Sequence, residues 1–348
     1  MDRERFERNR DLNDMETRSR KIVLQSNPLR LGVIATTVCN LRCIMCLSSR
    51  HTKDATLSAS ALAKIDELLP FLERIEWQGG EVFGIDHIRD YFVTLSRYPQ
   101  ISHRFTTNGL LLDEEWIELL LACRSEITFS IDGARKETYE RIRRGGRFED
   151  LIRNLNLIRK MEMEHHKSIR RHLTVVVMAS NCQELAEFVP FAAAFGFYSL
   201  SFRPVMLLEN EENIFQRPDF DGRSLAVTGE LMRRKCEELN IAFCWMLPTP
   251  PEDQSPRTAV PVPLAADRLF CNYPWKSLWI SADREGDIFP DCWCRQPIGN
   301  VSTETCLQAW NSEKMQEYRR RIIMHDSGLC NKDCVTGYSA AVDPKNYE

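Results

Sequence analysis

The chain has 348 residues, enough for one large α/β domain with a smaller appendage or for two ordinary domains. Its formal net charge is −4 and its pI is near 6.1, so no excess of basic residues points to a nucleic-acid or membrane partner. No run approaches the roughly 20 apolar residues of a membrane span, and the charged first residues lack the apolar core of a signal peptide. We therefore expect a cytoplasmic protein.

The 13 cysteines are numerous and unevenly spaced. Because a reducing compartment disfavours structural disulfides, clustered cysteines there more often bind metal or take part in redox chemistry. Three lie within residues 39–46 and six between residues 271 and 334. Isolated cysteines more often act as small buried apolar residues, and we expect this of the other four, Cys123, Cys182, Cys236 and Cys244.

Residues 1–28 are predicted to form a helical or partly ordered lead-in that ends at Pro28. Beyond it, short apolar or β-branched segments alternate with segments of helical periodicity. Such alternation is typical of βα units and predicts an α/β domain with a parallel sheet over residues 29–205. The expected strands lie within residues 29–37, 75–84, 103–109, 126–133, 172–181 and 197–205.

The rest of the chain differs in composition. Residues 206–266 are polar and rich in proline around one helical segment, and we interpret them as a connection. Residues 267–348 combine short strand-like runs with tryptophans and cysteines, which indicates a small second domain. Within it, the sequence WKSLWISADREGDIFPDCWC predicts a β-hairpin that turns at DREGD.

Glycine-containing motifs mark the ends of three predicted strands, as QGGE at 78–81, TTNG at 106–109 and SIDG at 130–133. In a parallel barrel or open sheet, ligands bind at the carboxyl ends of the strands. These motifs are therefore expected to surround one common mouth. The cysteine octet CNLRCIMC, at 39–46, follows the first strand directly and should lie there too.

The octet supplies three cysteines, Cys39, Cys43 and Cys46. Structural zinc prefers four protein ligands, and an iron–sulfur cluster normally takes four thiolates. If these three cysteines are all the protein ligands of an iron–sulfur cluster, one iron keeps an open coordination position. That iron can bind a substrate or cofactor directly and pass it an electron. The alternative is a zinc knuckle whose fourth ligand, such as His51, comes from nearby.

Residues 29–205 resemble the radical S-adenosylmethionine (SAM) superfamily. The resemblance is carried by four motifs in this order along the chain: C-x3-C-x2-C, Gly-Gly-Glu, Asn-Gly and Ser-Ile-Asp-Gly. The resemblance implies a partial (β/α)6 TIM-like barrel. It also implies a [4Fe–4S] cluster on Cys39, Cys43 and Cys46, with SAM chelating the fourth iron. One electron from the cluster then cleaves SAM, and the resulting 5′-deoxyadenosyl radical abstracts a hydrogen atom from the substrate.

The same resemblance assigns several residues to SAM binding. Gly79, Gly80 and Glu81 match the segment that receives the methionine amino group, and the glycines could alternatively only form turns. Two further candidates, Ser130 and Asp132, match a strand end that approaches the ribose or the methionyl end, although they could instead cap a helix beginning at Ala134. The remaining candidates are Asn108, in the same ring, and Met45, which stands where an aromatic residue often packs on adenine.

The C-terminal cysteines resemble the auxiliary iron–sulfur appendages of this superfamily, the SPASM and shorter twitch domains. A full SPASM domain needs more cysteines than are present, so we expect one auxiliary [4Fe–4S] cluster, held by Cys271, Cys292, Cys330 and Cys334. Zinc on the same four cysteines is an alternative. Cys294 and Cys306 are left over. Cys294 could replace a ligand, could be a spectator, or could face the mouth and return a hydrogen atom to a substrate radical, as in an epimerase.

The resemblance implies a radical enzyme that oxidises or epimerises an unactivated C–H position in a small polar, sugar-like molecule or a peptide. The lead-in is too short for a peptide-binding domain, which favours a small polar substrate or a peptide presented by a separate protein. Arg203 could hold an anionic group on SAM or substrate, or form a surface ion pair. A flavodoxin- or ferredoxin-like one-electron reductant is expected. The alternatives are a non-catalytic binding protein stabilised by zinc or iron–sulfur sites and an electron-transfer protein.

Overall fold

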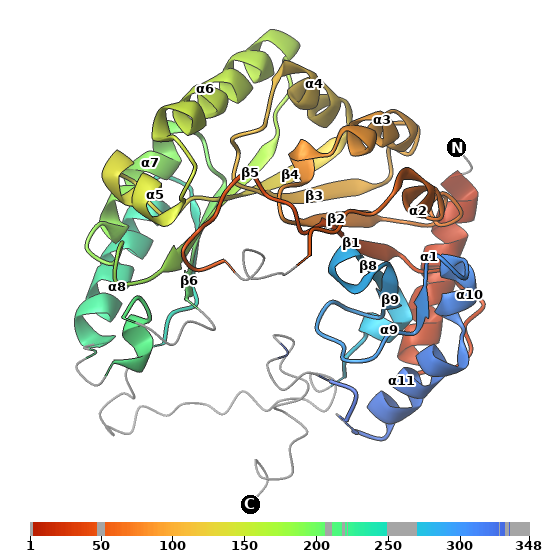
Figure 1. Ribbon diagram of the computed structural model, residues 1–348. Coiled ribbons are helices and arrows are strands. Elements are labelled where there is room, and N and C mark those ends of the chain that lie inside the picture. Colours follow the sequence, from red (N-terminus) through yellow and green to blue (C-terminus); the bar gives the residue numbers. More distant parts are fainter. Residues whose placement is uncertain are drawn as a thin grey trace, which may run out of the picture.

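The fold was taken from a computed structural model, which describes residues 3–46, 53–205, 211–217, 220, 222–248, 270–326, 328–330 and 334. The described residues form one curved ten-stranded sheet in the order β10-β9-β8-β1-β2-β3-β4-β5-β6-β7, with helices along its convex side (Figure 1). The α/β class and the partial barrel are both confirmed. No helix of this described part has the length and apolar character that a membrane span requires.

All six predicted strands are present in the first part of the sheet. They are β1 (Arg30–Thr36), β2 (Arg74–Gly79), β3 (Ser102–Thr107), β4 (Arg124–Ser130), β5 (Arg170–Val177) and β6 (Ser199–Pro204), and each runs parallel to its neighbour. A seventh parallel strand, β7 (Ala242–Trp245), lies in the segment interpreted as a connection. The sequence did not predict this strand, because a single strand of four residues outside the βα region gives no alternating pattern of strands and helices.

The C-terminal strands continue the same sheet. The predicted hairpin consists of β8 (Ser277–Ser281) and β9 (Asp287–Phe289), followed by β10 (Gly299–Asn300). β8 lies parallel to β1, with Arg30 opposite Ser277. The barrel and the cysteine-rich region are therefore joined by backbone hydrogen bonds between strands almost 250 residues apart in sequence, and their relative placement is fixed by the sheet.

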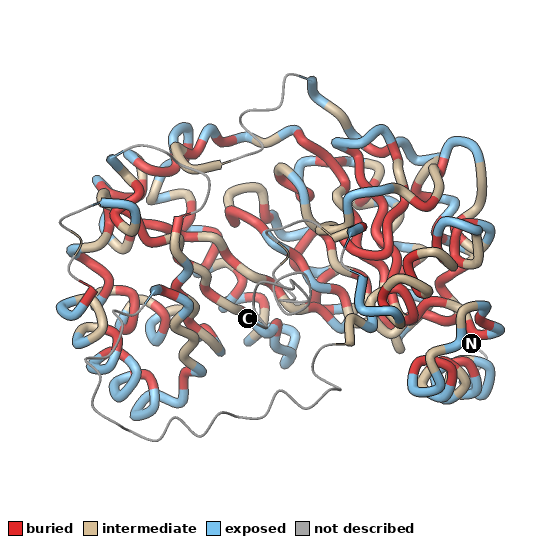
Figure 2. Tube along the Cα trace, turned by 90° about the horizontal axis from the view of Figure 1, so that it is seen from below, coloured by how far each residue is buried: buried red, intermediate tan, exposed pale blue. Residues whose placement is uncertain are grey.

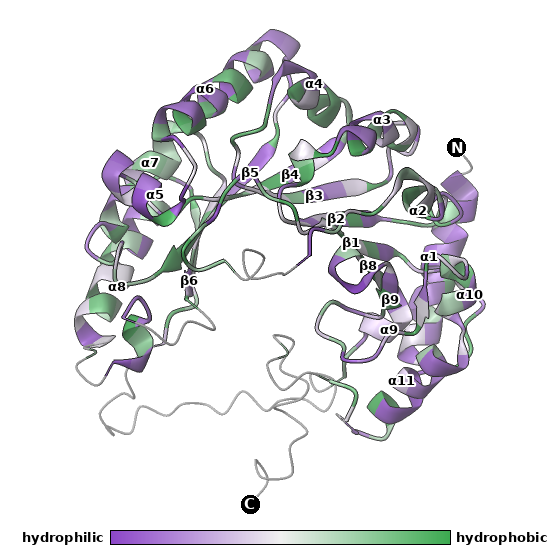
Figure 3. Cartoon of the chain, in the orientation of Figure 1, coloured by the Kyte–Doolittle hydropathy of each residue, from purple (hydrophilic) through white to green (hydrophobic). Residues whose placement is uncertain are grey.

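The helices cover the outer face and leave the inner face open. They are α1 (Arg3–Arg18), α2 (Ala59–Ala63), α3 (Asp86–Leu95), α4 (Glu114–Ala122), α5 (Lys136–Ile142), α6 (Phe148–His165), α7 (Phe188–Ala194), α8 (Gly222–Glu238), α9 (Tyr273–Lys276), α10 (Cys306–Trp310) and α11 (Glu313–Ile323). Side chains cap the N-termini of α2 and α4, because Ser58 accepts from the Ala61 N–H and Asp113 from the Trp116 N–H. Red buried segments run through the strands in Figure 2, and the helices carry both polar and apolar residues in Figure 3.

Alternation along each strand separates two environments. Trp77 and Phe105 point outward and pack with Phe92 of α3, at ring-centroid distances of 5.7 and 5.4 Å. Their sequence neighbours therefore point to the inner face. On that face, Arg104 and Glu126 form an ion pair at 3.0 Å. The concave side of the sheet is thus polar and charged, whereas the side beneath the helices is apolar.

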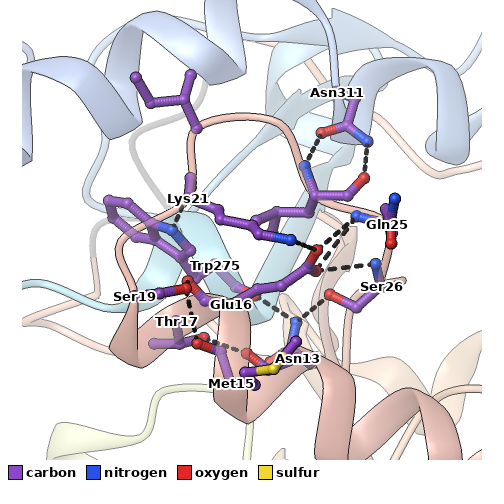
Figure 4. Close-up of polar contacts among 12 residues, drawn as sticks. Asn13, Met15, Glu16, Thr17, Ser19, Lys21, Gln25, Ser26, Trp275 and Asn311 are labelled. Atoms are coloured by element: carbon purple, nitrogen blue, oxygen red, sulfur yellow. Dashed lines mark hydrogen bonds and ion pairs between the residues drawn. The ribbon is translucent and has the colours of Figure 1, made fainter.

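The N-terminal lead-in docks on the C-terminal helices (Figures 1 and 4). Asn13 donates to the Trp275 carbonyl at 2.7 Å, and the Trp275 indole donates to the Lys21 carbonyl at 2.7 Å. Glu16, which is fully buried, accepts from the backbone N–H groups of Gln25 and Ser26. These side-chain to backbone bonds join the start of the chain to the cysteine-rich region.

A buried arginine completes this contact. Arg319 of α11 is inaccessible to solvent and donates to the carbonyls of Ile22, Pro274 and Trp310 at 2.7 to 2.9 Å. Replacing it with methionine leaves those carbonyls without donors, and we expect a loss of about 3 kcal/mol in the free energy of unfolding. Urea unfolding of the reconstituted protein measures this. Arg320→Met, on the exposed side of the same helix, should change stability by less than about 1 kcal/mol, and equal effects of the two substitutions would contradict the expectation.

Candidate metal and cofactor site

Two glycines bring the end of β2 against the chain that leads into the cysteine loop. The Gly80 N–H donates to the Thr36 carbonyl at 2.6 Å, and the Glu81 N–H donates to the Val38 carbonyl at 2.9 Å. A Cβ atom on Gly80 would lie 2.0 Å from the Val38 oxygen, and one on Gly79 would lie 2.3 Å from the Thr36 oxygen. Only glycine permits this approach, so the pair fixes where the cysteine loop begins.

The loop itself is held by the backbone that follows α5. The Arg42 N–H donates to the Arg144 carbonyl at 2.9 Å, and the Ile44 N–H donates to the Ile142 carbonyl at 3.0 Å. The Cys46 N–H closes a turn onto the Cys43 carbonyl at 3.1 Å. Cys43 is buried, whereas Cys39 and Cys46 are half-exposed. The three thiols therefore project from one short loop anchored at both ends.

A buried ion pair lies against the loop. Arg143 and Asp132 are 2.5 Å apart and almost fully buried, and an Arg143 N–H faces the Cys43 Sγ at 3.8 Å. Burial raises the pKa of the Cys43 thiol to about 11, and the Arg143 cation acts against that shift. Metal binding requires thiolates. Arg143 therefore supplies positive charge where three thiolates would gather.

Asp132 is engaged by other parts of the protein and does not form the helix cap that was one alternative for it. Its carboxylate accepts from the Val176 N–H at 2.7 Å and pairs with Arg143. It caps no helix, because α5 begins at Lys136 and its N-terminus carries no side-chain cap. Asp132 is inaccessible to solvent, whereas Ser130 on the inner face of β4 is half-exposed. The carboxylate thus positions Arg143, and Ser130 remains the more accessible of the two for a ligand.

Glu81 and Asn108 connect the ends of β2 and β3 to the loop. The Glu81 carboxylate is buried and accepts from the Thr107 hydroxyl at 2.7 Å and from the Asn108 N–H at 2.9 Å. Burial raises the pKa of Glu81, and these hydrogen bonds oppose the increase. The Asn108 amide donates to the Asn40 side chain at 2.8 Å and faces the Cys39 Sγ at 3.8 Å. Both residues therefore support the loop that carries the cysteines.

The two remaining residues assigned to SAM lie apart from this support. Met45 is half-buried and packs with Ile44 against a small apolar group formed by Ile142, Met178 and Val205. Arg203 lies near the end of β6 and is exposed. It forms no ion pair with another described residue at 4 Å or less. Met45 can thus offer an apolar surface beside the loop, and Arg203 an exposed cation at the rim.

A second group of cysteines forms in the C-terminal region. Cys294 and Cys330 pair as an antiparallel bridge, and both lie within electrostatic range of Cys271. Cys334 lies within range of Cys271 and Cys330 as well. Burial raises the pKa of Cys271 to about 12 and of Cys330 to about 11. Cys294 therefore belongs to this cluster of thiols, and does not stand alone at the barrel mouth.

Cys292 lies at the edge of the same group, facing the sheet. It contacts Asp291, with its Sγ 3.9 Å from the carboxylate, and lies within electrostatic range of Glu76 and Cys334. Cys306, in contrast, is buried on α10 and its electrostatic neighbours are Glu67, Lys64 and Glu304. Among the described residues, no three His, Cys, Asp or Glu side chains are close enough together to hold a single metal ion.

The sequence did not identify two residues that support the cysteine loop, Arg143 and Thr107. Arg143 appears in the sequence only as one cation of the run RIRRGG, and nothing marks which of these arginines turns inward. A cation next to a glycine pair, placed to face a cysteine loop, is the signal that could have identified it. Thr107 precedes the Asn108 already singled out, and its hydroxyl was not considered as a partner for Glu81.

Comparison with known proteins adds family and fold relationships. Residues 33–187 match the model of the radical SAM superfamily, and residues 271–335 match SPASM, an iron–sulfur cluster-binding domain. The mycofactocin maturase MftC of Mycolicibacterium smegmatis is 29% identical over 174 residues, which are 49% of this chain and 43% of that protein. A GTP 3′,8-cyclase of Desulforamulus reducens is 30% identical over 169 residues, or 47% of this chain and 50% of the relative. The chain thus spans about half the length of these curated relatives.

Solved structures resemble nearly the whole chain. The alignment with SuiB of Streptococcus suis bound to S-adenosylmethionine spans 89% of this chain and 71% of the SuiB chain, with a TM-score of 0.63 and 16% identity. The structure of anSMEcpe with bound AdoMet covers 90% of this chain and 94% of its own, with a TM-score of 0.59 and 16% identity. At such identities the likeness shows the fold.

Proposed function

Because the chain belongs to the radical SAM superfamily and carries a C-terminal SPASM-type domain, we propose that it modifies a peptide at an unactivated C–H bond. Its cofactors are SAM and [4Fe–4S] clusters. When bound, they supply the electron that cleaves SAM and the radical that removes a hydrogen atom from the substrate. The observation that carries the proposal is the three-cysteine loop, whose donor set leaves one iron of a four-iron cluster without a protein ligand.

The residues present fit this cofactor. Cys39, Cys43 and Cys46 project from one anchored loop, and Arg143 provides a cation beside them. The chain's own contribution is to hold that loop in place, through the Gly79–Gly80 contact and through Glu81 and Asn108. The charged methionyl end of SAM would bind to polar groups of the backbone and of side chains that form a rim next to the cysteine loop. Ser130 and Arg203 are the accessible candidates on that rim.

The second cluster would be held by Cys271, Cys330 and Cys334 with a fourth thiolate. The pairing of Cys294 with Cys330 supports Cys294 in that position and leaves Cys292 near Glu76 on the inner face of the sheet. A ligand role for Cys294 makes it unavailable as a hydrogen donor. The arrangement therefore favours oxidation of the substrate, with the second cluster accepting an electron, over epimerisation.

A peptide is favoured as the substrate, in place of a sugar-like molecule, because of the solved structures that match this chain. One holds SuiB with the precursor peptide SuiA, and another holds anSMEcpe with AdoMet and the Cp18Cys peptide. Both align over about nine-tenths of the present chain. The inner face of the barrel offers the polar side chains of Arg104, Glu126 and His172, which suit a peptide with polar side chains.

Anaerobic reconstitution followed by addition of SAM and dithionite tests the proposal. We expect about eight irons per chain and release of 5′-deoxyadenosine. Candidate peptides are those encoded beside the gene, and an oxidised product loses the mass of two hydrogen atoms. Epimerisation in heavy water would instead add one deuterium. Iron-loaded protein that never forms 5′-deoxyadenosine would overturn the radical chemistry, whereas 5′-deoxyadenosine without any change in the peptides would overturn only the substrate class.

A further inference from the structure

A cavity of about 710 Å³ opens at the amino-terminal edge of the sheet, beneath α1. One wall comes from α1, including Arg3, Phe6 and Arg10, and the other from the first residues of several strands. The cysteine loop follows the opposite, carboxyl end of β1. Because β1 has seven residues, it separates this cavity from the loop by about 20 Å. The cavity is therefore distinct from the site proposed for SAM.

The strand wall of the cavity has an unusual concentration of positive charge. Arg30 is the register partner of Arg74, Arg74 of Ser102, and Ser102 of Arg124. Adjacent strands are only about 4.8 Å apart, and like charges at neighbouring positions destabilise a sheet. Three arginines along one edge of four strands thus carry an electrostatic cost that a bound anion would offset.

The carboxylates that line the cavity neutralise one member of this row, Arg30, and otherwise pair with arginines outside it. Glu73 is already paired with Arg30 at 2.8 Å, and Glu126 with Arg104 at 3.0 Å. The carboxylate nearest to Arg74 among the described residues is Glu76 at 3.9 Å, and the buried Arg74 Nε has no hydrogen-bond partner among them. Burial and the neighbouring guanidinium groups of Arg104 and Arg30 lower the pKa of Arg74.

Arg124 has spare donors as well. Its side chain donates to the Gln100 carbonyl at 3.4 Å, and it forms no ion pair with another described residue at 4 Å or less. The Ser102 hydroxyl lies between Arg74 and Arg124 in the register and can donate in the same direction. Two guanidinium groups and a hydroxyl therefore line one concave site, and among the described residues Glu76 is the one carboxylate within 4 Å of either guanidinium.

We propose that this cavity binds a small phosphorylated anion, with Arg74 and Arg124 as its main ligands. The planar fork of arginine suits phosphate oxygens, and the volume falls within the range of small-molecule sites. Arg10 on the facing wall would contact the same ligand from α1. The bound anion would link α1 to the edge of the barrel, in addition to the contact of Asn13 with Trp275.

Calorimetric titration of the reconstituted protein with pyrophosphate tests this site. We expect saturable binding that weakens as salt is raised, because the contacts are ionic. Arg74→Gln and Arg124→Gln should each weaken the binding about tenfold, the effect of losing one charge-assisted hydrogen bond. Arg97→Gln is the matched control, because Arg97 is exposed and lies outside the cavity. It should bind pyrophosphate as the unmodified protein does.

Two results would overturn the proposal. One is the absence of saturable pyrophosphate binding to a protein that still holds its iron. The other is an affinity for Arg124→Gln equal to that of Arg97→Gln. Arg124 is exposed, so its replacement should leave the fold intact even if the half-buried Arg74 proves necessary for folding. The readout is binding, so the result does not depend on whether the proposed peptide chemistry is correct.

Discussion

Alanine at Cys39, Cys43 or Cys46 is expected to abolish 5′-deoxyadenosine formation and to halve the iron content, from about eight to about four irons per chain. Each thiolate would hold a different iron of the cluster, and among the described residues 39–46 the polar side chains of Asn40 and Arg42 are engaged elsewhere. The Asn40 side chain accepts from Asn108, and Arg42 donates to the Cys39 carbonyl at 2.7 Å. Iron analysis and chromatography of the nucleoside product measure the two effects.

The C-terminal thiols provide the internal reference for that experiment. They lie in a separate group around the β8–β9 hairpin, so the remaining four irons should stay bound. Cys123→Ala is the matched control, since Cys123 ends α4 and lies in neither group. The Cys123→Ala protein should keep about eight irons per chain, the number expected for two four-iron clusters. Full iron content and activity in Cys43→Ala would refute the assignment of the first cluster.

The arrangement of β-strands could be predicted from sequence because it follows local rules. Each strand from 29–37 to 197–205 is a short apolar run between helical segments, and parallel pairing then places their carboxyl ends together. The continuation of the sheet through β8 could not be predicted in this way. It depends on Arg30 meeting Ser277, and no periodicity in either segment identifies the other.

The positions of the candidate residues could also be predicted, but their partners could not. The motifs correctly marked the residues at the ends of β2, β3 and β4. However, Glu81 and Asp132 are occupied by other parts of the protein, the first by Thr107 and Asn108 and the second by Val176 and Arg143. A carboxylate in a motif shows its charge in the sequence, whereas burial and the nearest donors are properties of the folded chain.

The same distinction explains why the sequence does not show whether Cys294 or Cys292 belongs to the C-terminal group of thiols. Cys294 follows Cys292 by two residues, so both fit one spacing equally well. In a strand-like segment, residues two apart point to the same side, which gives the sequence no means of choosing between them. The backbone bridge from Cys294 to Cys330 separates the two, because it places Cys294 inside the group and Cys292 toward Glu76.

Gly80→Ala is expected to reduce 5′-deoxyadenosine formation by roughly a hundredfold although no ligand is removed, because small misplacements in a reactive site have effects of that size. The new Cβ would lie 2.0 Å from the Val38 carbonyl oxygen, and no side-chain rotation relieves the clash, because the oxygen is a backbone atom and the Cβ is fixed directly to the backbone. Val38 directly precedes Cys39, so any relief of this clash displaces the first thiolate. Rates should be measured together with iron content and urea unfolding.

Gly84→Ala is the control, three residues beyond the motif and in the short helix η2 (Val82–Gly84). There the new methyl group would meet only the end of the Leu111 side chain, at 3.1 Å, and that side chain can adjust. We therefore expect nearly unchanged activity. Equal losses in Gly80→Ala and Gly84→Ala would mean that the segment responds to any added bulk, and an active, fully iron-loaded Gly80→Ala protein would show that the close approach of β2 does not set the position of the cysteine loop.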